Sequence, residues 1–172
     1  IDSLEQLVKA AEDNNTKISQ VVLEYEVENS QQSREELLEK MRSNWRVMHQ
    51  SVQEGLNKRG ATMGGLVEGS ASAVRTAVSQ KRIPKDRLSL TVMRALAVAE
   101  VNASMGLIVA APTAGACGII PAVVITAQES EGYSDEQMVM ALFTAAGIGL
   151  VIKRNACISG AEGGCQAECG SA

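Results

Sequence analysis

Aromatic side chains are nearly absent from this 172-residue chain, and their scarcity limits the folds that it can adopt. They make up 2% of the residues, namely Tyr25, Trp45, Tyr133 and Phe143, whereas hydrophobic residues as a whole reach 45%. The core therefore has to be built from Ala, Val, Ile, Leu and Met, a set that suits closely packed helices. The sequence predicts an all-α, multi-helix fold, with residues 1–172 in a single domain because a chain of this length can bury a sizeable core.

The first 60 residues are predicted to form amphipathic helices. Ser3 and Gln6 have the spacing of a capping box, and the apolar residues that follow share one helical face: Leu4, Leu7, Val8 and Ala11. A second helix is expected to begin within residues 16–19 and to end within 29–32. Ser33 and Glu36 form another capping box, after which apolar residues recur every three or four positions up to a stop at Gly60: Leu37, Met41, Trp45, Met48 and Val52.

Residues 61–172 are predicted to alternate glycine-rich loops with buried helices. Loops are expected at residues 60–72, 106–118 and 159–170, and helices at 86–105, 119–128 and after a Ser134–Gln137 cap. Residues 107–111 could also form a strand, but a helix end or extended loop is preferred. The apolar run 138–152 is shorter than the roughly 20 residues that cross a bilayer, so we expect a buried helix and no membrane contact.

Charge and cysteine content exclude several classes of function. The net charge is −4 and the basic residues form no stripe, so nucleic acid is not an expected partner. No secretory leader opens the sequence, which favours a reducing, cytoplasmic location. The four cysteines lie in the second half, and a disulfide-stapled secreted domain would normally be shorter and richer in cysteine. Metal or cluster chemistry is the more informative hypothesis.

The first candidate stretch, residues 111–121, combines small residues with one hydroxyl. Such a turn could hold a carboxylate through backbone amides, with Thr113 and Gly115 as the candidate groups. The alternative is tight helix–helix packing through small residues, and from the residues alone packing is the favoured reading.

The second candidate stretch, residues 155–170, contains three of the four cysteines. If the part after Gly164 is helical, Cys165 and Cys169 lie on one face and could share a metal. Two thiolates do not complete a tetrahedral zinc site, and the sole histidine, His49, lies far away in the sequence. Inert buried cysteines therefore remain an open alternative. Glu162, in the same turn, could be either a tuned carboxylate or a solvated one.

These two stretches, with Glu100-Val101-Asn102-Ala103-Ser104-Met105-Gly106 leading into the first, resemble the α chain of bacterial iron–sulfur L-serine dehydratases. The resemblance is specific from Glu100 onward, where Pro112-Thr113-Ala114-Gly115 and the segment from Ser159 to Gln166 match in order and spacing. It implies a lyase that converts L-serine to pyruvate and ammonia.

The resemblance also implies the cofactor and its ligands. In that family a [4Fe-4S] cluster is held by three cysteines and leaves one iron open as a Lewis acid, and no pyridoxal phosphate is required. Cys165 matches the first ligand, and the other two belong to a segment downstream of Ala172, so the domain is expected to be incomplete at its C-terminus. Cys117, Cys157 and Cys169 match no family ligand and are weaker metal candidates.

The same resemblance supplies partners and alternatives. The proton-abstracting base is expected on a separate β chain, so no catalytic residue is assigned to this chain, which is expected to be inactive alone. A homo- or hetero-oligomer is also expected. Thr113, Gly115, Ser159, Gly160 and Gly163 are the candidates for binding L-serine. Two alternatives stay open: a lyase similar to cysteine desulfidases, and a non-catalytic helical module that docks onto the β chain.

Overall fold

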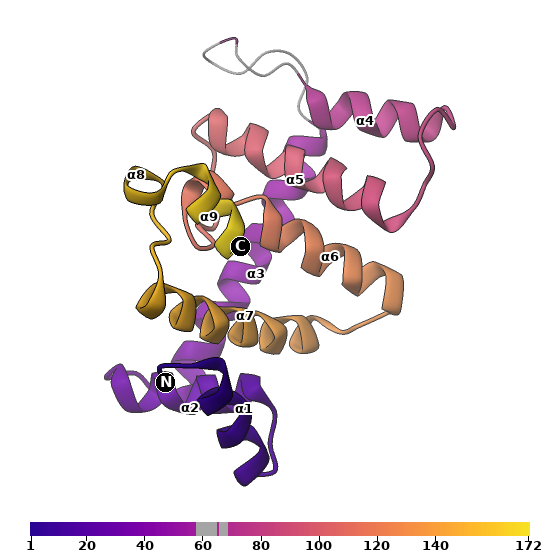
Figure 1. Ribbon diagram of the computed structural model, residues 1–172. Helices are drawn as coiled ribbons and strands as arrows, with labels where there is room; N and C mark the ends of the chain where they lie inside the picture. Colours follow the sequence, from indigo (N-terminus) through magenta and orange to yellow (C-terminus); the bar gives the residue numbers. More distant parts are fainter. Residues whose placement is uncertain (58–64, 66–68) are drawn as a thin grey trace. The chain divides into compact units, whose positions relative to one another are not determined.

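The computed structural model describes residues 1–57, 65 and 69–172, and every regular element within them is helical (Figure 1). The all-α prediction is confirmed. In chain order the elements are α1 (Leu4–Asp13), α2 (Ile18–Asn29), α3 (Arg34–Asn57), α4 (Ser70–Ser79), α5 (Arg87–Ala103), the 3-10 turn η1 (Ala114–Ala116), α6 (Ile119–Glu131), α7 (Asp135–Asn155), α8 (Gly160–Gly163) and α9 (Cys165–Ser171).

The described chain divides into two compact units, and α3 contributes to both. Unit 1 comprises Ile1–Trp45 and Ser134–Ser171, and unit 2 comprises Arg46–Tyr133 with Ala172. This division does not test whether residues 1–172 fold as a single domain. The single domain therefore stays a prediction.

Hydroxyl and carboxylate caps start the N-terminal helices, as the sequence predicts. The Gln6 N–H donates to Ser3 Oγ at 3.2 Å, although the Gln6 side chain bonds to the N–H of Asp2 and not to that of Ser3. Before α3, Glu36 Oε2 accepts from the Ser33 N–H at 2.7 Å, and Ser33 Oγ accepts from the Glu36 N–H at 3.3 Å. These bonds satisfy backbone donors that have no partner within the helix.

The predicted apolar face of α1 is only partly buried. Leu7 and Ala11 are buried, but Leu4 and Val8 remain 50% and 43% exposed. A short helix that contacts neighbouring helices on one side only buries fewer apolar residues than the spacing of those residues in its sequence predicts. Along α3 the predicted stripe is buried at Trp45, Met48 and Val52.

In unit 1, α2 packs against α7 through small and branched residues. Val22 and Leu23 are almost fully buried, and a Cβ atom added to Gly147 would lie 2.3 Å from Val22 Cγ2. The glycine therefore allows the two helices to approach more closely than any side chain at that position would permit.

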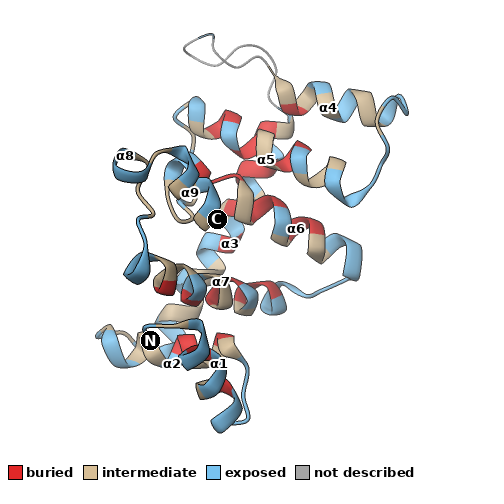
Figure 2. Cartoon of the chain, in the orientation of Figure 1, coloured by how far each residue is buried: buried red, intermediate tan, exposed pale blue. Residues whose placement is uncertain are grey.

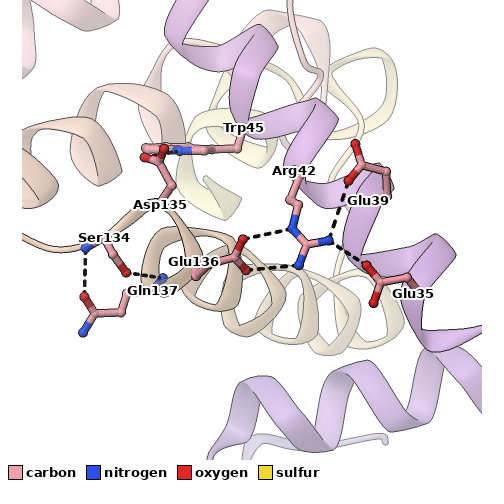
Figure 3. A network of polar contacts seen from close by, with 8 residues as sticks. All are labelled: Glu35, Glu39, Arg42, Trp45, Ser134, Asp135, Glu136 and Gln137. Atoms are coloured by element: carbon pink, nitrogen blue, oxygen red, sulfur yellow. Dashed lines mark hydrogen bonds and ion pairs between the residues drawn. The ribbon is translucent and has the colours of Figure 1, made fainter.

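A polar network joins the first part of α3 to the start of α7 in unit 1 (Figure 3). Arg42 donates to both carboxylate oxygens of Glu136, at 3.0 and 3.3 Å, and to Glu35 at 2.9 Å. The indole N–H of Trp45 donates to Asp135 Oδ1 at 3.0 Å. The two acidic residues lie in the first turn of α7, where negative charge also favours the helix dipole.

Helix α7 is longer than the apolar run that predicts it. The Ser134–Gln137 capping box forms as expected, and the helix continues to Asn155, giving 21 residues. By length and composition this helix could cross a membrane, so the prediction that it is too short to do so was wrong. The core helix of a soluble protein can have the same length and composition. It packs against α2 and α1, but only 33% of its apolar window is buried, so the helix is less buried than predicted.

In unit 2, α4 and α6 both pack against α5, and buried positions lie along α5 and α6 (Figure 2). The buried apolar residues of this unit are mostly Ala and Val. A Cβ on Gly55 would lie 2.1 Å from the carbonyl oxygen of Ala97, and one on Gly118 would lie 2.5 Å from that of Ala95. Backbone from α3 and from the start of α6 therefore lies directly on α5, which is the packing that an aromatic-poor sequence favours.

The loop predicted at residues 60–72 does not extend to residue 72. Residues 60–64 and 66–68 lie outside the described part of the chain, but residues 70–72 already belong to α4, so the loop prediction was wrong there. Gly69 adopts φ 65° just before the helix, and the Ala71 N–H donates to Glu100 Oε1 at 3.0 Å. The start of α4 is thus capped by a residue on α5, which local sequence patterns do not reveal.

Candidate functional site

The segment that leads into the first candidate stretch begins where α5 ends in unit 2. Met105 takes φ 60°, and the Gly106 N–H donates to the Val101 carbonyl at 2.9 Å, which closes the helix. Residues 107–110 then form neither helix nor strand, in agreement with the preferred loop. Asn102 Nδ2 donates to the carbonyl of Ala114 at 3.0 Å and so fastens the turn to α5.

Thr113 and Gly115 lie in this turn on either side of the first residue of η1. Thr113 is half-buried with extended backbone, and its carbonyl accepts from the Ala111 N–H at 3.3 Å. Gly115 is exposed. The turn therefore presents a hydroxyl side chain next to accessible backbone, which is the arrangement that the carboxylate-binding hypothesis needs.

Cys117 has a different environment, although it lies only two residues after Gly115. Its side chain is 1% exposed, and burial raises the pKa of its thiol because the interior disfavours the thiolate. This is the environment of an inert, packed cysteine.

The second candidate stretch forms a compact turn in unit 1. The Ser159 carbonyl accepts from the N–H groups of Glu162 and Gly163, at 3.2 and 2.8 Å, and the Gly160 carbonyl accepts from the Gly164 N–H at 3.0 Å. The Gly163 amide is thereby engaged within its own turn. Ser159 makes no side-chain bond to the start of α8.

Two carboxylates border this turn. Glu162 Oε2 accepts from the Cys157 thiol at 3.3 Å. The side chain of Glu168 lies so close to Gly160 that a Cβ on the glycine would be 1.4 Å from Glu168 Oε1. Neither contact is evident from the sequence, because each joins residues across a turn whose shape depends on glycines. The surroundings of Ser159 and Gly160 are consequently acidic, which favours a cationic group over an anionic one.

Cys165 and Cys169 form the thiol pair that the helical spacing predicts. Gly164 takes φ 74° and ends α8, so that Cys165 becomes the first residue of α9. The two sulfur atoms lie 3.5 Å apart, and both side chains are exposed. The shared hydrogen bond with Cys165 is the main reason that the pKa of the Cys169 thiol is raised, since it favours the protonated form.

The described residues by themselves do not fit a cluster that needs three thiolates. Nowhere in the described ranges do three His, Cys, Asp or Glu side chains come together in a group that could hold a metal ion. The 3.5 Å separation of the Cys165 and Cys169 sulfurs is close to the roughly 3.8 Å expected for two thiolates on one tetrahedral ion with bonds of about 2.3 Å. Thiolates on two different irons of a cluster stand farther apart.

Buried charges support the first stretch from within unit 2. Glu100 is 2% exposed and, as noted above, caps α4. Arg94, also buried, donates to Thr126 Oγ1 at 2.6 Å and pairs with Glu129, which links α5 to α6. Both Glu100 and Arg94 interrupt an otherwise apolar helix, and this is the feature of the sequence that could have indicated their structural roles. His49, by contrast, is half-buried on α3 and enters neither stretch.

Comparisons with known proteins place these two stretches in a family. Residues 13–172 match the family model described as serine dehydratase alpha chain. The chain is 39% identical over 173 aligned positions to the L-serine dehydratase alpha chain of Peptoniphilus asaccharolyticus, covering 100% of this chain and 59% of that protein. It is 38% identical to the probable L-serine dehydratase alpha chain of Bacillus subtilis, covering 99% and 57%, respectively.

A longer relative shows the same similarity. L-serine dehydratase TdcG of Escherichia coli is 39% identical over 173 positions, which cover 97% of this chain and 38% of that protein. The chain thus spans less than two thirds of the length of each of these relatives.

Proposed function

The chain belongs to the serine dehydratase alpha chain family, and on that basis we propose that it takes part in the deamination of L-serine to pyruvate and ammonia. The observation that carries the proposal is the match over residues 13–172, together with relatives named L-serine dehydratase that share 38–39% identity along almost the whole chain. Because two relatives are named alpha chains, we propose a β chain as the partner. We also propose a reducing cytoplasm as the location, on the cysteine content of the sequence.

We further propose that the cofactor is the [4Fe-4S] cluster implied by the sequence resemblance, with no pyridoxal phosphate. When bound, such a cluster supplies an iron that acts as a Lewis acid on the substrate hydroxyl. Cys165 is our proposed ligand from this chain, because it is exposed at the end of a glycine-rich turn. The remaining thiolates come from beyond the described residues, since no group of three exists within them.

We propose substrate-binding roles for residues of each stretch, taking each unit by itself. Thr113 and the backbone of Gly115 suit the carboxylate, because the turn offers a hydroxyl and accessible backbone. Ser159 and Gly160 suit the ammonium group, because the carboxylates of Glu162 and Glu168 border their turn. The engaged N–H of Gly163 makes this residue a shaping element of the turn.

The carboxylate role of Thr113 can be tested in the complete two-chain enzyme. We expect Thr113→Val, which removes the hydroxyl and keeps the shape, to raise the KM for L-serine about tenfold, the loss of roughly 1.4 kcal/mol of binding. Thr76→Val is the matched control, because Thr76 is exposed on α4 and its hydroxyl donates to the Ser72 carbonyl of its own helix. An unchanged KM in Thr113→Val would refute the role.

The cofactor assignment can be tested on the 172-residue chain itself. After anaerobic addition of iron and sulfide, we expect visible and electron paramagnetic resonance spectra to show no stable cluster, and the chain alone to release no pyruvate from L-serine. Robust cluster formation by residues 1–172 would show that the ligands are misassigned. In the complete enzyme, faster pyruvate release from L-cysteine than from L-serine would favour the desulfidase-like alternative.

A further inference from the structure

Cys165 and Cys169 lie one helical turn apart at the surface, with their sulfur atoms 3.5 Å from each other. Both are free thiols, and α9, which carries them, has seven residues and no buried side chain. Ideal helix geometry places Cα atoms four residues apart at about 6.2 Å. That value lies within the range of about 4.4–6.8 Å found across disulfide bonds.

A bond between these sulfurs requires a local change in α9. Side chains four residues apart on a helix have Cβ atoms about 5–6 Å apart, whereas a disulfide brings them to roughly 3.5–4.5 Å. The change is confined to a short exposed helix, so no core packing opposes it. Such an exposed, somewhat strained bond belongs to the class that is readily reduced again.

The other cysteines are placed less favourably for pairing. Cys117 is buried in unit 2 with 1% exposure, so reagents in solution do not reach it. Cys157 is exposed, but its thiol donates to Glu162 and to the Ser159 carbonyl, at 3.3 and 3.5 Å, whereas Cys165 bonds to Cys169. The geometry therefore singles out one pair.

We infer that Cys165 and Cys169 form a reversible disulfide with each other. The oxidant is an organic disulfide such as glutathione disulfide. One of the two thiols, as a thiolate, attacks a sulfur of glutathione disulfide and releases a first glutathione. The second cysteine attacks the resulting mixed disulfide and releases a second glutathione. The pair loses two electrons and two protons, and the oxidant is reduced to two molecules of glutathione.

This disulfide would control whether the proposed iron–sulfur cluster can bind to Cys165. Since a disulfide sulfur is not a thiolate ligand, oxidation would withhold Cys165 from iron, a consequence that rests on the function proposed above. Formation of the disulfide itself requires neither iron nor substrate. A test on the metal-free chain therefore separates this inference from the assignment of the enzyme.

Proteolysis at two glutamates makes the test direct. The 172-residue chain is equilibrated in buffers with different ratios of glutathione to glutathione disulfide, and its remaining thiols are then alkylated. Proteases then cut the chain after Arg154, Glu162 and Glu168. These cuts place Cys157, Cys165 and Cys169 on three separate peptides. We expect mass spectrometry to find peptides 163–168 and 169–172 joined, with the loss of two hydrogens, and dithiothreitol to separate them.

Two variants complete the test. In Cys157→Ser the joined peptides should persist at unchanged yield. In Cys169→Ser they should disappear, leaving Cys165 either alkylated or bound to glutathione. Joining of Cys165 to Cys157, or only glutathione adducts and alkylated thiols at every ratio in the original chain, would overturn the inference.

Discussion

Two glycine-rich segments of this chain look alike in sequence and differ in structure. Residues 106–118, called here the packed segment, and residues 157–171, the exposed segment, each combine small residues with cysteine. In the packed segment Gly118 lies against the backbone of α5, and its neighbour Cys117 is buried. In the exposed segment the glycine contacts are with residues of the same segment, and its cysteines are exposed.

The difference shows that small residues serve two purposes in one chain. In the packed segment they remove bulk so that helices can approach, and the thiol becomes part of the core. In the exposed segment they let a short chain fold back on itself and present thiols and carboxylates at its surface. Reactive sulfur chemistry therefore belongs to the exposed segment, whereas the packed segment is suited to holding a turn rigidly.

Thiol alkylation of the native chain should give the largest contrast between the segments. We expect N-ethylmaleimide to modify Cys157, Cys165 and Cys169 at least about 100-fold faster than Cys117, because Cys117 becomes accessible only in rare open states. Timed quenching followed by mass spectrometry of the digested chain gives the four rates. In concentrated urea the rates should converge, and a native Cys117 that reacts as fast as the others would break the comparison.

Adding a methyl group to one glycine of each segment should separate packing from local folding. In Gly118→Ala the new Cβ would lie 2.5 Å from the Ala95 carbonyl, so we expect the free energy of unfolding to fall by about 1–3 kcal/mol. Gly170→Ala is the matched change in the exposed segment, where the added Cβ meets no atom within 4 Å. It should keep or slightly raise stability, by less than about 1 kcal/mol.

Urea titrations followed by circular dichroism measure both changes. Equal losses in the two variants would mean that the glycines of the packed segment do not mediate a close helix contact.

The sequence predicts the helices of both units better than it predicts these segments. Caps such as Ser33 with Glu36 and Ser134 with Gln137 act within one turn, so their spacing is sufficient to locate a helix start. The α4 helix begins where Glu100, far along the chain, accepts from its backbone, and no local pattern encodes that bond. Long-range contacts are therefore where prediction failed.

The candidate site divides in the same way. The pairing of Cys165 with Cys169 follows from helical periodicity, and the structure confirms that they share a face. The burial of Cys117 was left open, because small residues before a helix suit either a binding turn or close packing. The contacts of Glu168 with Gly160 and of Glu162 with Cys157 depend on glycine-shaped turns, whose backbone angles the sequence alone does not specify.

The N-cap of α5 offers a pH-dependent test of the scaffold beneath the packed segment. The Ser89 N–H donates to Asp86 Oδ1 at 2.8 Å, and this bond lowers the pKa of the Asp86 carboxyl. A lowered folded-state pKa stabilises the fold above the unfolded-state value, near 3.8, and the contribution is lost as the pH falls through the folded-state value. We expect Asp86→Ala to lower the urea midpoint at pH 7.

At a pH below both values the gap between the original chain and Asp86→Ala should shrink. Asp86→Asn is the control, because its amide oxygen can cap the helix without titrating. A gap of the same size at both pH values would show that the charge of Asp86 contributes nothing. Alkylation of Cys165 should not change in Asp86→Ala, since Asp86 belongs to unit 2 and Cys165 to unit 1.

The smallest expected effect lies within the exposed segment itself, in the reactivity of Cys169. Its thiol pKa is raised chiefly by the hydrogen bond with Cys165, so at pH 8 a smaller share of it is thiolate than in an isolated cysteine. Cys165→Ala removes that bond, which should lower the pKa of Cys169 and speed its alkylation. Cys157→Ala should leave the rate unchanged, because Cys157 bonds to Glu162 and Ser159 instead. If Cys169 reacts no faster without Cys165, the two thiols are neighbours without being coupled, and the exposed segment loses the feature that most distinguishes it from the packed one.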